Sequence, residues 1–83
     1  MKNELFGIAT CLGMPVFYYL LSDSGGYGIG VEYQGETVLL RRLSRVRSEV
    51  EALLTDMRQG SVTPVTARDV AEDWFSQGNP CFF

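Results

Sequence analysis

The sequence predicts an α+β fold, in which an antiparallel meander of three to four strands is followed by two amphipathic helices. Up to residue 43, apolar side chains recur at every second position or form short runs between glycine-rich turns, as in strands joined by short links. Beyond residue 44 the spacing changes to three and four, which is typical of helices with one buried face. The 83 residues suffice for one domain, 1–83, with 1–4 and 78–83 as tails.

The first two predicted strands are residues 5–12 and 16–21. In the first, Phe6, Ile8 and Leu12 alternate with smaller side chains, which predicts one face of large residues. Residues 13–15 have turn chemistry. The second strand is apolar at every position, so we expect a central strand that is covered on both faces.

The third and fourth predicted strands are residues 27–33 and 36–43. Large side chains alternate with Gly28 and Gly30 in the third strand, so one of its faces is thin. The dipeptide at 34–35 makes a short turn into the fourth strand. Short links of this kind favour antiparallel pairing of consecutive strands.

The two helices are expected near residues 44–59 and 64–77. Ser44 is a suitable N-cap because its hydroxyl can accept a hydrogen bond from the free amides of the first turn. Gly60 is a suitable residue to follow the end of the first helix. Pro64 favours a helix start, since the first helical position needs no N–H. The expected buried stripe of the second helix is Ala67, Val70, Ala71, Trp74 and Phe75.

Composition excludes several classes of chemistry. The net charge is −3 and histidine is absent, which argues against a polyanion-binding protein and removes the commonest proton shuttle and metal ligand. Cys11 and Cys81 are too few for a disulfide scaffold or a zinc site, so we read them as free thiols of a cytoplasmic protein. No metal or other cofactor is expected. The uncharged run 5–22 contains Gly7, Gly13 and a proline, which argues against a membrane span.

Four arginines form the one basic segment, where the last strand meets the first helix. Exposed amides at a helix start attract anions, so a phosphate or nucleic-acid contact is the alternative function. Nucleic-acid binding is disfavoured because the domain is acidic overall, and a solvated cluster paired with neighbouring acids explains the segment better. The candidate residues are Arg41, Arg42, Arg45 and Arg47.

Three carboxylates on the second predicted helix give an enzymatic alternative. Asp69, Glu72 and Asp73 lie at positions i, i+3 and i+4, a spacing that can present carboxylates to a divalent cation in an acidic-residue hydrolase. A second acidic helix is lacking. The polar face of an amphipathic helix is therefore the favoured interpretation, and we expect no catalytic residues.

The leading functional hypothesis is a noncatalytic protein-interaction or regulatory module, and self-association into a homodimer is expected. Neighbouring residues of a strand point to opposite faces, so Tyr18 and Tyr19 cannot both be covered by two short helices on one side. Aromatic residues at the C-terminus also need cover. The interface candidates are Phe17, Tyr19, Phe82 and Phe83.

Three segments resemble a known family. They are Tyr18-Tyr19-Leu20-Leu21, Tyr27-Gly28-Ile29 and, most specifically, Val62-Thr63-Pro64-Val65 with the following Arg68-Asp69-Val70-x-Glu72-Asp73. The family consists of small uncharacterised proteins of Gram-positive bacteria and is designated a domain of unknown function. The resemblance implies a bacterial, cytoplasmic setting, and it implies no binding or catalytic residue.

Overall fold

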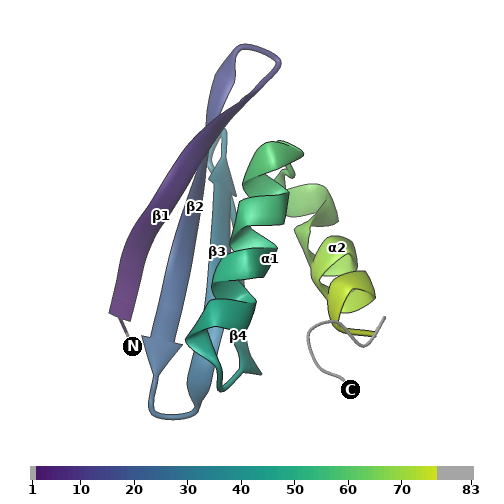
Figure 1. Ribbon diagram of the computed structural model, residues 1–83. Helices are drawn as coiled ribbons and strands as arrows, with labels where there is room; N and C mark the ends of the chain where they lie inside the picture. Colours follow the sequence, from purple (N-terminus) through teal and green to yellow (C-terminus); the bar gives the residue numbers. More distant parts are fainter. Residues whose placement is uncertain (1, 77–83) are drawn as a thin grey trace.

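The computed structural model describes residues 2–76 as one antiparallel sheet with two helices packed on one of its faces (Figure 1). The strands are adjacent in the sheet in sequence order, β1-β2-β3-β4. The predicted meander followed by two helices is therefore confirmed, with four strands. The elements are β1 (Lys2–Cys11), β2 (Met14–Asp23), β3 (Gly26–Tyr33), β4 (Glu36–Ser44), α1 (Arg47–Gln59) and α2 (Pro64–Ser76).

Two tight turns set the register of the meander. Leu12 and Gly13 join β1 to β2 with φ angles of 53° and 81°, and Gln34 and Gly35 join β3 to β4 with φ angles of 50° and 84°. Two central residues with positive φ match the right-handed twist of the flanking strands. The first turn lies one residue earlier than predicted, because Met14 already pairs with β1.

The prediction that residues 1–4 form a tail was wrong for Lys2 to Glu4. β2 extends to Asp23, and Lys2 pairs with Ser22 while Glu4 pairs with Leu20. Backbone hydrogen bonding to a long partner strand does not require apolar side chains, so a polar segment joined the sheet.

β1 departs from simple alternation at Phe6. Its register with β2 shifts between Leu5 and Gly7, so Phe6 is the extra residue of a β-bulge. Phe6 packs against the core on the helix side, whereas Ile8 lies on the other face and Leu12 is in the turn, 93% exposed. The predicted face of large residues in β1 was therefore wrong, because the bulge moves Phe6 to the face opposite Ile8.

The start of α1 also differs from the prediction. Ser44 is the last residue of β4, and its Oγ accepts a hydrogen bond from the Val46 N–H at 3.0 Å and donates one to the Glu49 Oε1 at 2.6 Å. The Ser44 hydroxyl thus closes a turn between Ser44 and Val46. α1 begins at Arg47, three residues after Ser44, and Val46 occupies the N-cap position without a side-chain hydrogen bond.

The link between the helices is closed by backbone hydrogen bonds. Gly60 has a φ of −91°, and Ser61, with a φ of 52°, takes the left-handed conformation. The N–H of Val62 donates to the carbonyl of Met57 at 3.0 Å, a bond that ends α1 in the manner of a Schellman motif. α2 then starts at Pro64, as predicted.

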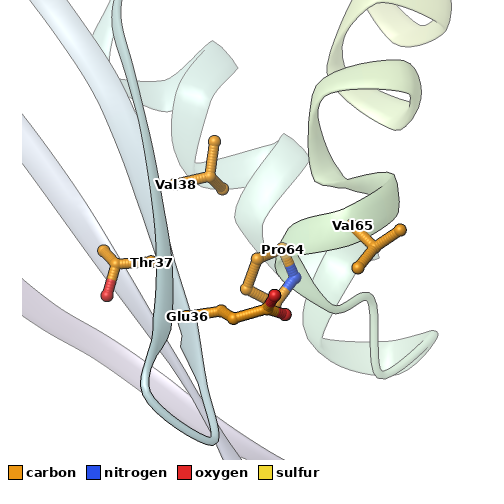
Figure 2. A pocket seen from close by; sticks show the side chains of 5 residues that line it. All are labelled: Glu36, Thr37, Val38, Pro64 and Val65. Atoms are coloured by element: carbon orange, nitrogen blue, oxygen red, sulfur yellow. The ribbon is translucent and has the colours of Figure 1, made fainter.

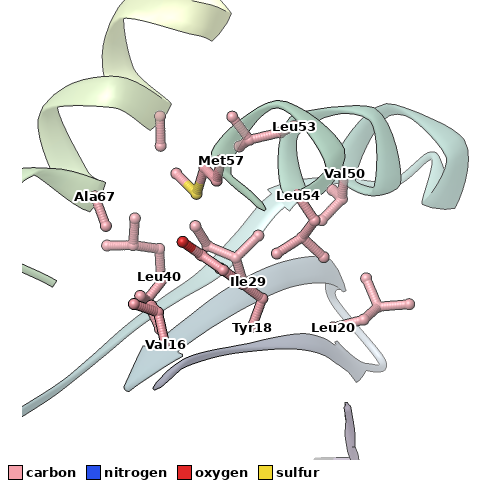
Figure 3. Packing of buried hydrophobic residues seen from close by; sticks show 12 residues of the cluster. Val16, Tyr18, Leu20, Ile29, Leu40, Val50, Leu53, Leu54, Met57 and Ala67 are labelled. Carbon is pink, nitrogen blue, oxygen red and sulfur yellow. The ribbon is translucent and has the colours of Figure 1, made fainter. Parts of the chain in front are cut away.

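The core lies between the sheet and the helix layer (Figure 3). Tyr18 is fully buried there, and its hydroxyl donates a hydrogen bond of 2.7 Å to the Val62 carbonyl, which ties β2 to the link between the helices. Burial raises the pKa of Tyr18 to about 12, with a further contribution from Cys11. The buried residues of this cluster are Val16, Tyr18, Leu20, Ile29, Val31, Leu40, Val50, Leu53, Leu54, Met57, Ala67 and Ala71.

Candidate functional site

The face of the sheet opposite the helices is apolar, and we call it the open face. Its side chains follow from the register: Leu5 pairs with Tyr19, Ile8 with Phe17, and Leu39 with Gly30. Both helices lie on the other side of the sheet (Figure 1). The exposed fractions of Leu5, Ile8 and Leu39 are 53%, 48% and 41%. The open face comprises Leu5, Ile8, Phe17, Tyr19, Leu21 and Leu39, with Gly28, Gly30, Glu32 and Thr37 between and beside them.

Tyr19 illustrates how the two faces differ. Tyr18 is buried beneath the helices, whereas the next residue, Tyr19, is half-buried on the open face. The Tyr19 hydroxyl donates a hydrogen bond of 3.3 Å to the Glu32 Oε1. Partial burial and the nearby Glu32 carboxylate both raise the pKa of Tyr19. The pair therefore holds a carboxylate over an otherwise apolar surface.

The two glycines of β3 keep the middle of the open face low. A Cβ on Gly30 would lie 3.1 Å from the Leu39 Cδ2 and 3.7 Å from the Leu21 Cδ2, so these two leucines lean over Gly30. A Cβ on Gly28 would lie 2.1 Å from the Leu40 carbonyl oxygen, so the backbone of β4 itself passes over Gly28. The strand pair comes close at this point because β4 is irregular there, with Arg42 at a φ of 58°. Leu21 is only 1% exposed, although it lies on the open face.

Of the four predicted interface residues, the structure brings Phe17 and Tyr19 together, two residues apart on the open face. Phe82 and Phe83 lie outside the described residues. The sequence reasoning missed Leu5, Ile8 and Leu39. Leu39 could have been found from the sequence, because neighbours on a strand face opposite ways and the adjacent Leu40 is in the core. Leu5 and Ile8 could not, because the bulge at Phe6 interrupts the alternation between them.

The four predicted anion-binding arginines are all exposed, and carboxylates engage two of them. Arg42 lies 3.5 Å from the Asp23 carboxylate, whose pKa is lowered mainly by the Gly25 N–H and also by Arg42. Arg47 pairs with Glu51 at 2.9 Å and with Glu4 at 3.3 Å, and the hydrogen bond to Glu51 is the main reason that the pKa of Arg47 is raised.

For Arg41 and Arg45, the described residues contain no ion pair within 4.0 Å. The segment is thus partly neutralised by three acidic residues from β1, β2 and α1. This pairing agrees with the interpretation as a solvated charge cluster, and anion binding stays a prediction.

The acidic residues of α2 point to water. Asp69, Glu72 and Asp73 are exposed, and residues 2–76 contain no group of three or more histidine, cysteine or carboxylate side chains placed to hold a metal ion. Cys11 is a half-buried free thiol, and its carbonyl accepts a hydrogen bond of 3.0 Å from the Tyr33 hydroxyl. Cys81 lies outside the described residues.

A shallow depression of about 320 Å³ lies between the start of β4 and the start of α2 (Figure 2). Its lining consists of Glu36, Thr37, Val38, Pro64 and Val65. Glu36 is the one titratable side chain among these five. General acid–base work and metal binding normally need a second such group close by, so we assign no chemistry to the depression.

The fold and the open face define a class: a small α+β protein whose meander carries helices on one face and an apolar surface on the other. The chain belongs to a family of unknown function (DUF6514), and the sequence pattern of that family matches residues 9–77. Searches of curated proteins and of solved structures give no match. Between residues 2 and 76, neither helix has the length and apolar character needed to cross a membrane.

Proposed function

We propose that this protein is a noncatalytic interaction module and that it binds a protein partner through the open face. One observation carries the proposal: three exposed aliphatic side chains, Leu5, Ile8 and Leu39, share a sheet face with half-buried aromatic residues. Single exposed apolar residues are ordinary, whereas a contiguous apolar patch on a small protein marks a binding surface.

The arrangement of the two layers supports this proposal. A sheet of four strands has two faces to cover, and both helices pack on one of them. Solvated sheet faces normally carry polar side chains at alternate positions. Here Phe17, Tyr19 and Leu21 occupy the open-face positions of the central strand β2, so its pattern is that of a strand buried on both sides.

Site-specific photo-crosslinking tests the proposal. The photoreactive residue benzoylphenylalanine replaces Ile8 on the open face or, as the control, Val65, which is 76% exposed on α2. After irradiation of cells that express the protein, covalent protein adducts are expected from position 8 and few from position 65. Equal yields from the two positions, or no adduct from position 8, would refute the proposal. Circular dichroism of both purified variants verifies that the fold is retained.

We further propose a cytoplasmic setting in a Gram-positive bacterium. The resemblance at residues 62–73 and the free thiol of Cys11 support it, because cytoplasmic proteins keep their cysteines reduced. Fractionation of the producing cells is expected to recover the protein with the soluble cytoplasmic proteins. Recovery with the secreted or envelope fraction would contradict this setting.

A further inference from the structure

The size of the open face fits a small symmetric interface. β3, the shortest strand, has eight residues. Four strands spaced by about 4.8 Å, each with eight residues rising about 3.3 Å, cover roughly 500 Å² of flat sheet. This is less than the roughly 800 Å² that each partner buries in a standard protein interface, so the open face would form a small one.

The charges on the open face are arranged at its two ends. Glu32 lies at one end of β3, held by the Tyr19 hydroxyl. At the other end, Asp23 faces the same side as Leu21 and is paired with Arg42 at 3.5 Å. A Cβ on Gly28 would lie 2.8 Å from the Arg41 Cα, so the Arg41 backbone lies on the open side of the sheet there. Gly28, which lies beside the Arg41 backbone, is four residues from Glu32 along β3, which is about 13 Å of strand. The region between them holds Tyr19 and Leu39 over Gly30.

This arrangement is complementary to itself. If a second copy is stacked on the open face with its strands in the opposite direction, each Glu32 lies near the partner's Arg41, and the apolar centres coincide. Stacking in the same direction would instead leave both Glu32 side chains at the same end of the interface. A face that is complementary to itself under a twofold rotation is what a homodimer requires, and opposite charges across an interface fix the orientation.

The outer edge of β1 is less suited to self-association. The Arg58 side chain extends from α1 across Gly7, and its Nε donates a hydrogen bond of 3.4 Å to the Ile8 carbonyl. The bulge at Phe6 interrupts the same strand. Charged side chains and bulges at sheet edges hinder pairing with another strand. Stacking of faces is therefore favoured over extension of the sheet through β1.

We propose that the partner of the open face is a second copy of this chain, stacked face to face with its strands in the opposite direction. The inference rests on the proposed binding role of the open face and names its partner. Leu5, Ile8, Phe17, Tyr19 and Leu39 form the apolar part of the interface, and two symmetric contacts between Glu32 and Arg41 accompany it.

Sedimentation velocity tests the dimer at protein concentrations from about 2 to about 200 µM, a range that reveals micromolar dissociation constants. The native chain is expected to sediment as a dimer at the upper end. Ile8→Lys is expected to raise the dissociation constant at least about tenfold, because it buries two charges in the apolar interface, one from each copy. The matched control Val65→Lys, on α2, is expected to leave the dissociation constant unchanged.

Charge reversal tests the orientation. Glu32→Arg and Arg41→Glu are each expected to weaken the dimer about tenfold, and the double variant is expected to return to within about threefold of the native value. Within one chain about 13 Å of strand separates the positions of the two residues, and the described residues contain no ion pair between them within 4.0 Å, so the rescue reports contact between copies. Circular dichroism checks each variant for folding.

Specific results would overturn this inference. They are a native chain that stays monomeric at the highest concentration, a dimer that Ile8→Lys does not weaken, and a double charge variant no tighter than the single ones. The crosslinks at position 8 show whether only the homodimer is excluded or whether the binding role of the open face is excluded as well. Adducts to a different protein would retain the open face as a binding surface while excluding the homodimer, and the lack of any adduct would refute both.

Discussion

The close approach of β4 to β3 makes a sharp prediction about two glycines on the same strand and the same face. In Gly28→Ala, the new Cβ would lie 2.1 Å from the Leu40 carbonyl oxygen and 2.8 Å from the Arg41 Cα. Both are backbone atoms, so relief requires that β4 moves away from β3. In Gly30→Ala, the nearest atom is the terminal Cδ2 of Leu39 at 3.1 Å, which a small side-chain rotation can displace.

The expected magnitudes differ accordingly. Overpacking against a rigid neighbour costs about 1–3 kcal/mol and occasionally more, and the contact at Gly28 is tight enough that we expect about 3 kcal/mol of lost stability. For Gly30→Ala the small steric cost is opposed by the lower entropy of the unfolded chain, so the change should stay within about 1 kcal/mol. A loss of 3 kcal/mol is a large part of the roughly 5–15 kcal/mol that a domain has.

Urea unfolding followed by circular dichroism and by the fluorescence of Trp74 measures both variants. All samples are compared at one protein concentration, since self-association would raise the apparent stability. An unchanged dependence of the unfolding free energy on urea concentration shows that the comparison concerns the same transition. If Gly28→Ala is as stable as Gly30→Ala, the close passage of β4 over Gly28 is refuted.

Three further predictions concern the core. Tyr18→Phe removes the 2.7 Å hydrogen bond to the Val62 carbonyl and is expected to lower the free energy of unfolding by about 1–2 kcal/mol in urea titrations; an unchanged value would show that this bond contributes nothing. The pKa of Tyr18 is raised from 10.0 to about 12, so the stabilisation by its neutral phenol is complete below about pH 10 and is lost as the pH rises to about 12. Unfolding midpoints across this range should fall more steeply for the native chain than for Tyr18→Phe, and parallel curves would contradict the assignment. Met57→Ala empties a fully buried site facing the sheet and should cost about 2–5 kcal/mol by the same assay, whereas a loss below 1 kcal/mol would place Met57 outside the core.

Local patterns were enough to predict the elements. The alternation of Tyr27, Ile29 and Val31 with glycines identifies β3, and the spacing of Leu53, Leu54 and Met57 identifies α1, because both patterns depend only on which side chains share a face. The same logic showed that Tyr18 and Tyr19 face opposite ways. The antiparallel order followed from the short links, since no crossover fits in two residues.

Other features depended on contacts between distant segments. Ser44 has the chemistry of an N-cap, yet pairing with Tyr27 keeps it in β4, so the helix starts later. Ser61 adopts the left-handed conformation at the end of α1, although the neighbouring Gly60 could adopt that conformation without the steric cost of a Cβ. In both cases a local preference is outweighed by the hydrogen bonds that the neighbouring segments offer.

The sequence by itself thus determined a meander of three to four strands, two helices and an excess of apolar sheet surface. The tertiary structure alone decided which face the helices cover and which residues the other face displays. The bulge at Phe6 places Phe6 and Ile8 on opposite faces, and the irregularity of β4 brings its backbone over Gly28, and both features depend on register. Register is fixed by how whole strands and the helix layer fit together, and a one-residue shift moves a side chain to the opposite face.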